Sequence, residues 1–227
     1  MVNFSIERAL GWGFRTTWQR FGLMISVAGT WFLLTIIIEA LKVAILGAKF
    51  NLFNIHFADI TANINIAELY TNPLLVAFFV TKIVVQLVQE GLKLGIIKIG
   101  LDLYDGKSVG YTTLFSSFSI LIKYIVATFL YGLVVGLGTV AFIIPGIYLA
   151  LRYWMYGFVL VDTNVGIIDS LKASAVMTQG VKWHLFWYSI TANILVHLGY
   201  ITFFGILYIW PAIQLANIYI YRKCSAK

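Results

Sequence analysis

A stripe of polar side chains on an otherwise apolar segment is the feature best suited to chemistry. Its five members stand at positions i, i+4, i+7, i+8 and i+11: Lys82, Gln86, Gln89, Glu90 and Lys93. This spacing puts them on one face of a helix. A lysine facing lipid at the centre of a bilayer costs about 2.5–3.5 kcal/mol, so in a membrane the stripe must face other helices or a wet cleft. Glu90 and Lys93 can pair across one turn, whereas Lys82 has no acidic partner within a turn.

The composition indicates that lipid surrounds much of the chain. Of its 227 residues, 61% are hydrophobic and 11% are charged, and the mean hydropathy is +0.91. Soluble domains are about half apolar and about a quarter charged. The length suits a single integral membrane domain over residues 1–227. The net charge of +7 lies at the ends of apolar runs, so no nucleic-acid partner is expected. The single cysteine, Cys224, excludes an intrachain disulfide.

Long apolar runs predict an all-α fold, a polytopic transmembrane helical bundle. Each run is apolar on all sides and most are near the length that crosses a hydrocarbon layer of about 30 Å, which excludes the period-two pattern of a membrane barrel. About six spans are expected: 21–46, 73–99, 120–144, 147–161, 183–201 and 206–221. Pro145-Gly146 predicts the corner between the third and fourth spans. Helical spacing within 53–64 predicts a further helix on the outer surface.

Two segments predict amphipathic helices at the membrane interface. Residues 4–18 repeat Leu10, Phe14 and Trp18 at helical spacing, and they form either an interfacial helix capped by Asn3 or Ser5 or the frayed start of the first span. Residues 167–178 form the second, with Thr163 or Asn164 as cap and Gly180 as end. Its apolar side is Ile167, Ile168, Leu171, Ala175 and Val176, and its small polar seam is Ser170, Ser174 and Thr178. The seam either docks a partner protein or packs against the chain itself.

The basic residues predict the topology. Twelve of the 16 lie on one side of the expected spans: Arg8, Arg15, Arg20, Lys93, Lys98, Lys107, Lys123, Lys172, Lys182, Arg222, Lys223 and Lys227. The positive-inside rule makes this side cytoplasmic, so both termini are predicted to be cytoplasmic. Asp102, Asp105, Asp162 and Asp169 fall at the same edge and are interpreted as caps and turn formers. The pairs Gly91–Gly95 and Gly132–Gly136 suggest close helix crossings.

Three charged residues at similar depth form a candidate anion or lipid site. At 1.5 Å per residue, Lys82 lies roughly 13 Å below the outer end of its span and Arg152 roughly 9 Å below Gly146. Glu39 lies in the outer third of the first span. Two cations and one carboxylate leave a spare positive charge, which suits a lipid phosphate. In the alternative, Glu39 neutralises one cation and the other extends to the interface.

Sequence signatures of catalysis are absent. There is no phosphate-binding glycine loop, no nucleophile elbow and no His-Glu-x-x-His motif. No group of His, Cys, Asp and Glu has metal-ligand spacing, and the three histidines, His56, His184 and His197, are scattered. No cofactor and no metal are therefore expected, and an enzyme is not predicted.

Three stretches carry a family resemblance. They are IPGIYLALRYWMYGFVLVD, GIIDSLKASAVMTQGVKWHLF and, upstream, GLKLGIIKIGLDLYDGKSVGYTTLFSSF, with Pro211 in the last span. Together they resemble the YciC-like bacterial inner-membrane proteins and the membrane domain fused to some glycerophosphodiester phosphodiesterases. The resemblance implies a multi-pass protein of the bacterial plasma membrane. It does not bring the phosphodiesterase activity, because those enzymes carry their histidines, carboxylates and metal in a separate soluble barrel.

Two functional hypotheses follow. The first is a non-enzymatic scaffold or a lipid-interacting component of the cell envelope, with membrane lipids as partners and a possible protein partner at 167–178. The second is a small transporter or channel whose pathway runs along the stripe from Lys82 to Lys93. A pathway requires the stripe to be wet along its length, whereas a scaffold requires it to be dry and paired.

Overall fold

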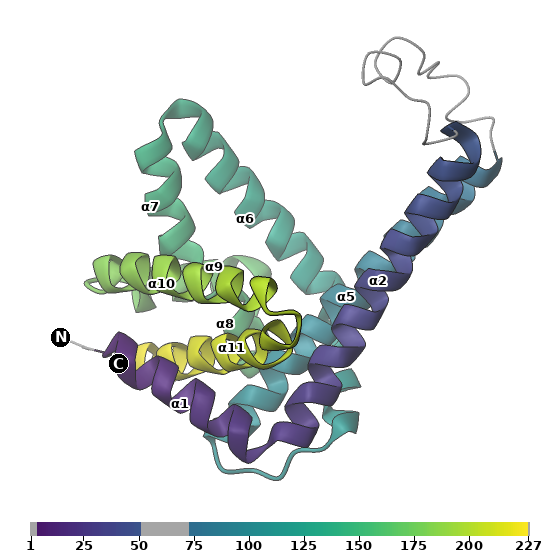
Figure 1. Cartoon of the computed structure of the whole chain (residues 1–227). Coiled ribbons are helices and arrows are strands. Elements are labelled where there is room, and N and C mark those ends of the chain that lie inside the picture. Colours follow the sequence, from purple (N-terminus) through teal and green to yellow (C-terminus); the bar gives the residue numbers. More distant parts are fainter. Residues whose placement is uncertain (1–3, 51–72, 227) are drawn as a thin grey trace. The chain divides into compact units, whose positions relative to one another are not determined.

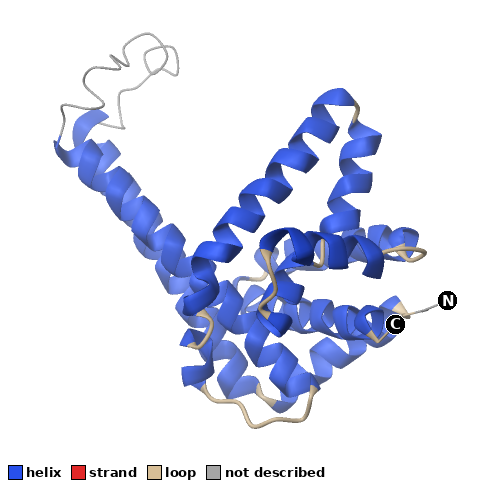
Figure 2. Ribbon diagram, turned by 180° about the vertical axis from the view of Figure 1, so that it is seen from behind, coloured by secondary structure: helices blue, strands red, loops and turns tan. Residues whose placement is uncertain are grey.

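The computed structural model describes residues 4–50 and 73–226, and the predicted helix within 53–64 lies outside them. Every described element is helical, as Figure 2 shows. The elements are α1 (Ile6–Gln19), α2 (Phe21–Phe50), α5 (Pro73–Tyr104), η1 (Tyr111–Phe115), η2 (Phe118–Ile120), α6 (Leu121–Ala141), α7 (Ile143–Tyr153), α8 (Tyr156–Thr163), α9 (Ile167–Met177), α10 (Lys182–Ile201) and α11 (Phe203–Ser225). The expected all-α fold is confirmed for this part of the chain.

Three described segments are long and apolar enough to cross a membrane. They are Phe21–Leu41, Tyr111–Ala141 and Ile143–Thr163. They coincide with the first, third and fourth spans expected from the sequence. The membrane character of the chain therefore has structural support, while the number of six spans stays a prediction.

The chain divides into two compact units that share α2 and α5. One unit is Thr30–Glu90 and the other joins Met1–Gly29 to Gly91–Lys227. In the first unit, the Nε2 of Gln89 on α5 donates to the Oγ1 of Thr35 on α2 at 3.0 Å. Large apolar side chains of both helices in this unit point outward, among them Leu33 and Ile83, each 59% exposed. An outward apolar surface of this kind suits lipid.

The core of the second unit surrounds the C-terminal part of α5. Leu92, Leu94, Ile99 and Leu101 are at most 2% exposed. Glycines on α5 allow close approach, because a Cβ at Gly91 would meet the Phe118 ring, one at Gly95 the Leu114 backbone and one at Gly100 the Ile218 side chain. The close approach predicted for Gly91–Gly95 is therefore observed, but the neighbours of this pair are the short 3-10 helices η1 and η2 and not a second long helix. Gly132 and Gly136 have open space around them, so that pair makes no crossing within the described residues.

Helix α1 packs antiparallel along α11. Ring contacts fix the direction, since Trp12 meets Tyr219 at 5.9 Å and Trp18 meets Tyr208 at 6.2 Å between centroids. The buried face of α1 consists of small residues one turn apart: Ala9, Gly13 and Thr17. Ser5 stands at the predicted cap position but makes no side-chain cap bond. The helix is therefore docked on protein along one face, with Trp18 exposed at its end.

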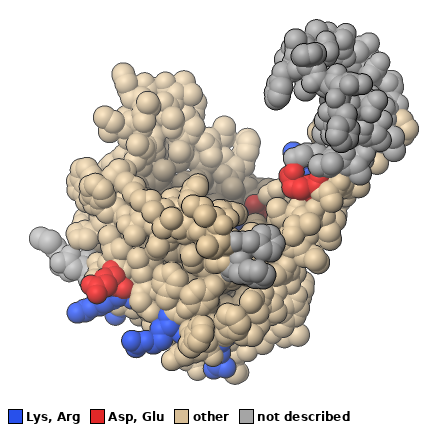
Figure 3. All heavy atoms as spheres, in the orientation of Figure 1, with Lys and Arg blue, Asp and Glu red and all other residues tan. Residues whose placement is uncertain are grey.

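Helices α6 and α7 form a hairpin, which is visible in Figure 1. The corner is at Phe142, whose backbone is extended, and Pro145 and Gly146 lie in the first turn of α7. The corner predicted at Pro145-Gly146 is thus wrong by three residues, because proline is well tolerated in the first turn of a helix. Gly146 permits close packing against Thr139. Val140 is 88% exposed and Ile144 is 80% exposed, and the tip carries no charged residue (Figure 3).

The contrast between Gly11 and Gly13 gives a test of the docking of α1 on α11. A Cβ at Gly13 would collide with the Ala212 backbone, whereas Gly11 has open space. We predict that Gly13→Ala lowers stability by about 1–3 kcal/mol through overpacking. Gly11→Ala is expected to raise it by about 0.5–1 kcal/mol, because alanine is the better helix former. Thermal unfolding in mild detergent measures both, and equal midpoints for the two variants would contradict the close contact.

Candidate functional site

The three residues of the predicted anion site are divided between the two units. Glu39 and Lys82 belong to the unit Thr30–Glu90, and Arg152 belongs to the other. Both Glu39 and Lys82 are exposed. Arg152 is the penultimate residue of α7 and is partly buried. The association of these three side chains stays a prediction.

The polar stripe of α5 is paired in part. Gln86 donates from its Nε2 to the Oε1 of Glu90 at 3.1 Å, one turn along the helix. Gln89 is 8% exposed and donates to Thr35. Lys93 is partly buried, whereas Lys82 is exposed. The stripe is therefore not uniformly open, because its middle residue is used in helix packing.

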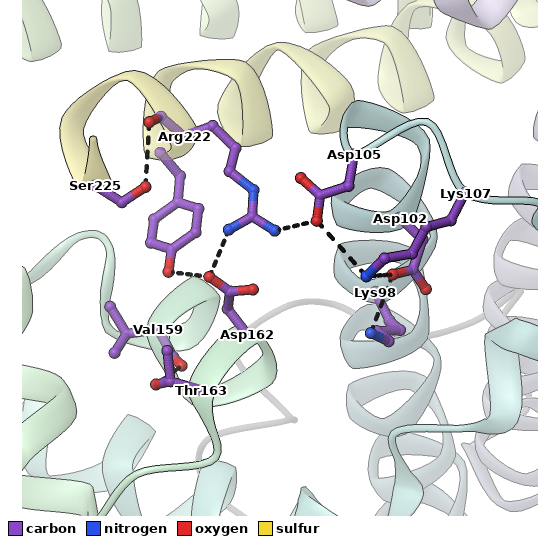
Figure 4. Close-up of polar contacts among 10 residues, drawn as sticks. Lys98, Asp102, Asp105, Lys107, Val159, Asp162, Thr163, Arg222 and Ser225 are labelled. Atoms are coloured by element: carbon purple, nitrogen blue, oxygen red, sulfur yellow. Dashed lines mark hydrogen bonds and ion pairs between the residues drawn. The ribbon is translucent and has the colours of Figure 1, made fainter.

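An ion-pair network joins the C-terminal ends of three helices, as Figure 4 shows. The Nη1 of Arg222 on α11 lies 2.6 Å from the Oδ2 of Asp162 on α8, and its Nη2 lies 2.7 Å from the Oδ2 of Asp105, just after α5. Tyr221 donates to the same Asp162 oxygen at 2.8 Å. The ends of α5, α8 and α11 are thereby fixed side by side.

The network continues along α5. Asp102 accepts from Lys98 at 3.1 Å and from Lys107 at 3.2 Å. Lys107 also lies 3.8 Å from Asp105, which connects this part to Arg222. Three carboxylates meet three cations, so the network is balanced and offers no surplus charge for a ligand. We call this network the clamp; its members are Lys98, Asp102, Asp105, Lys107, Asp162 and Arg222.

Electrostatics favour the charged form of Arg222 in the clamp. Burial lowers the pKa of Arg222, but the hydrogen bond and charge of Asp162 and the charge of Asp105 more than offset this, so its pKa is raised. The side chains of Arg222 and Asp162 are 18% and 21% exposed, so water screens the pair in part. The interpretation of Asp102, Asp105 and Asp162 as caps and turn formers missed these contacts. Asp162 and Asp105 lie 60 and 117 residues from Arg222 in sequence, so no local sequence pattern predicts these contacts.

A second group of polar contacts stabilises an interruption of the helix within the fourth expected span. The helix stops at Tyr153 and resumes at Tyr156, so α7 and α8 are separate. The Met155 N–H donates to Ser174 Oγ at 2.9 Å, and Thr178 Oγ1 donates to the Arg152 carbonyl at 2.9 Å. Backbone groups freed at a break must find partners where no water is available. The seam of α9 supplies them.

The seam predicted on 167–178 thus packs inside the protein. Ser170, Ser174 and Thr178 are all 0% exposed. The helix begins after Gly166, so capping by Thr163 or Asn164 is not observed. Asn164 instead ends α8 in the left-handed conformation and accepts a hydrogen bond from Lys123 at 3.0 Å. On the opposite side, Ile168 and Val176 are each 61% exposed, which leaves an apolar face free of the described protein.

Comparison with known proteins adds no assignment. No protein-family model, no curated protein and no solved structure matches the chain. Within the described residues, no group of three or more His, Cys, Asp and Glu could hold a metal ion.

The clamp predicts a specific sensitivity to loss of one charge. Arg222→Gln leaves Asp105 and Asp162 facing each other without their cation, and should lower stability by about 1–3 kcal/mol after allowance for screening. Lys223→Gln is the matched control, since Lys223 is exposed, lies over the Tyr219 ring and forms no ion pair within the described residues. Unfolding in detergent measures both, and equal effects would show that the clamp contributes nothing.

The α9 seam gives a second matched pair. Ser174→Ala leaves the buried Met155 N–H without its hydrogen-bond acceptor, which should lower the free energy of unfolding by about 1–3 kcal/mol. Ser170→Ala removes only a local bond to the Ile167 carbonyl and should cost less. Hydrogen exchange at the Met155 amide is the direct readout. It should accelerate in the Ser174 variant alone, and acceleration in neither variant would contradict the assignment.

Proposed function

We propose that the chain is a multi-pass protein of the bacterial plasma membrane that acts as a non-enzymatic scaffold or lipid-interacting component of the envelope. Its resemblance to YciC-like proteins is part of this proposal. The observation that carries it is the division of the surface. Charged side chains at the ends of α5, α8 and α11 are tied together, while the α6/α7 hairpin presents bare apolar side chains.

The clamp supports the proposed orientation. The second and fourth spans of an alternating topology run in the same direction. Helix α5 forms the second span and α8 ends the fourth. Asp105 directly follows α5, and Asp162 is the penultimate residue of α8. Lys123 at the start of α6 bonds Asn164 at the end of α8, which puts the start of the third span at the same level. The charges here are those that the positive-inside rule assigns to the cytoplasm. Both termini are proposed to lie there.

The number of times that the chain crosses the membrane depends on where α10 and α11 lie. The sequence predicts six, with these two helices as the fifth and sixth. The docking of α1 favours a different placement, because α1 runs beside α11 and carries the exposed residues Arg8 and Arg15. If α11 crossed the membrane, it would draw these arginines toward hydrocarbon at a cost of several kcal/mol. We therefore propose that α1, α10 and α11 lie along the cytoplasmic surface and that α2, α5, α6 and α7–α8 cross.

The transporter hypothesis has weaker support. A pathway along the stripe needs its members to stay wet, yet Gln89 is buried and bonded to Thr35. A paired amide is typical of helix packing in a membrane. The scaffold hypothesis accounts for this contact without further assumptions.

Cysteine labelling tests the orientation and the number of crossings together. In a Cys224→Ser background, we predict that Phe142→Cys reacts with a membrane-impermeant maleimide when the cytoplasm is sealed. Ser108→Cys and Thr202→Cys should react only after lysis, because both are exposed on the proposed cytoplasmic side. Reaction of Thr202→Cys in sealed cells would restore six crossings. Reaction of Ser108→Cys in sealed cells would overturn the orientation and the proposed function with it.

A further inference from the structure

A groove of about 530 Å³ lies between α7 and the start of α10. Four residues of α7 and three of α10 line it, and the lining is almost entirely apolar. Its volume falls in the range of small-molecule pockets. Helix α7 belongs to a segment long and apolar enough to cross a membrane, so in the proposed membrane location hydrocarbon chains lie next to the groove.

One end of the groove is positively charged. Lys182 lines it, and its Nζ lies 4.9 Å from the centre of the Tyr148 ring. Arg152 follows Tyr148 by one turn on α7, at the edge of the same face. Thr178, at the end of α9, bonds the Arg152 carbonyl, so the turn that leads to Lys182 lies beside Arg152. Arg152 does not itself line the groove, but its backbone lies beside the turn that leads to Lys182.

These two cations differ from those of the clamp. In the described part of the chain, neither Lys182 nor Arg152 lies within ion-pair distance of a carboxylate. The Nε of Arg152 is buried and has no hydrogen-bond partner there. A buried, unpaired donor of a cation is costly. An anion at this end of the groove would satisfy it.

We propose that the groove binds a phospholipid with an anionic head group. The phosphate lies between Lys182 and Arg152, and an acyl chain runs along Ile147 and Leu151 toward the hairpin tip. Trp183, the residue after Lys182, also lines the groove and is 72% exposed, which suits an indole at the level of the head groups. This inference rests on the proposed membrane location and names the class of lipid that the protein holds.

The lining explains why a lipid is the occupant. A soluble anion would gain the two cations but would leave the apolar wall uncovered. A zwitterionic lipid would cover the wall but would bring its own cation next to Lys182. An anionic phospholipid satisfies both parts of the groove, because charge and apolar surface are complementary at opposite ends.

Native mass spectrometry of the full chain tests the proposal. Delipidated protein in mild detergent is titrated with phosphatidylglycerol or with phosphatidylcholine of the same acyl chains, and bound lipid is counted. Wild type should bind the anionic lipid more tightly. Lys182→Gln should weaken binding of phosphatidylglycerol about fivefold, the amount expected for one cation near a lipid surface, and leave phosphatidylcholine unchanged.

Two further variants complete the test. Leu151→Trp fills the groove and keeps both cations, so it should weaken both lipids. Lys172→Gln removes an exposed cation of α9 that does not line the groove, and should change neither. Equal effects of the Lys172 and Lys182 variants, or no effect of Leu151→Trp, would overturn the groove as the site. These results leave the proposed function intact if the chain stays in the membrane pellet after a carbonate wash, whereas release by the wash would remove the proposed function itself.

Discussion

The pairing of Arg222 with Asp105 and Asp162 is the interaction on which the arrangement of the helix ends depends. Charged groups are expensive in hydrocarbon, so a helix that carries them at one end has that end fixed at the membrane surface. The guanidinium reaches two carboxylates from two other helices, at 2.6 and 2.7 Å. In the proposed membrane location, this contact puts the three ends at one surface, from which the apolar parts of α5 and α8 extend.

A second constraint acts where α7 gives way to α8. A helix that breaks near lipid exposes backbone groups that water cannot reach, and side chains must satisfy them. Ser174 and Thr178 do so from α9, and this explains why a short amphipathic helix is buried on its hydroxyl side. The same contact holds Arg152 beside the turn to Lys182. The break, the buried seam and the charged end of the groove are thus parts of one local arrangement.

Local pattern predicted the elements well and their contacts poorly. Periodicity predicted helices within 4–18 and 167–178, which are observed as Ile6–Gln19 and Ile167–Met177, and the apolar runs locate the α6/α7 hairpin. The corner was misplaced because Pro145 suits a first helical turn as well as a bend. The α1 partner was missed, although Ala9, Gly13 and Thr17 recur every four residues and such small residues mark a packing face.

Long-range pairings could not be predicted in the same way. Asp162 and Arg222 are ordinary surface residues in a sequence, and only the fold makes them neighbours. The predicted site of Lys82, Arg152 and Glu39 was built from depth along separate helices. Depth gives the level of a residue but not its direction around the helix, so the association of these three side chains stays a prediction.

Electron paramagnetic resonance measures directly whether hydrocarbon surrounds the α6/α7 hairpin. Spin labels at Ile122, Phe129 and Leu137, which are 78%, 66% and 70% exposed, sample α6 from its start toward the tip. In lipid bilayers we expect the label at Phe129 to be more accessible to oxygen than to a water-soluble nickel complex, with a smaller excess at Ile122. Greater accessibility to the nickel complex at Phe129 would show that water surrounds the hairpin and would contradict the account.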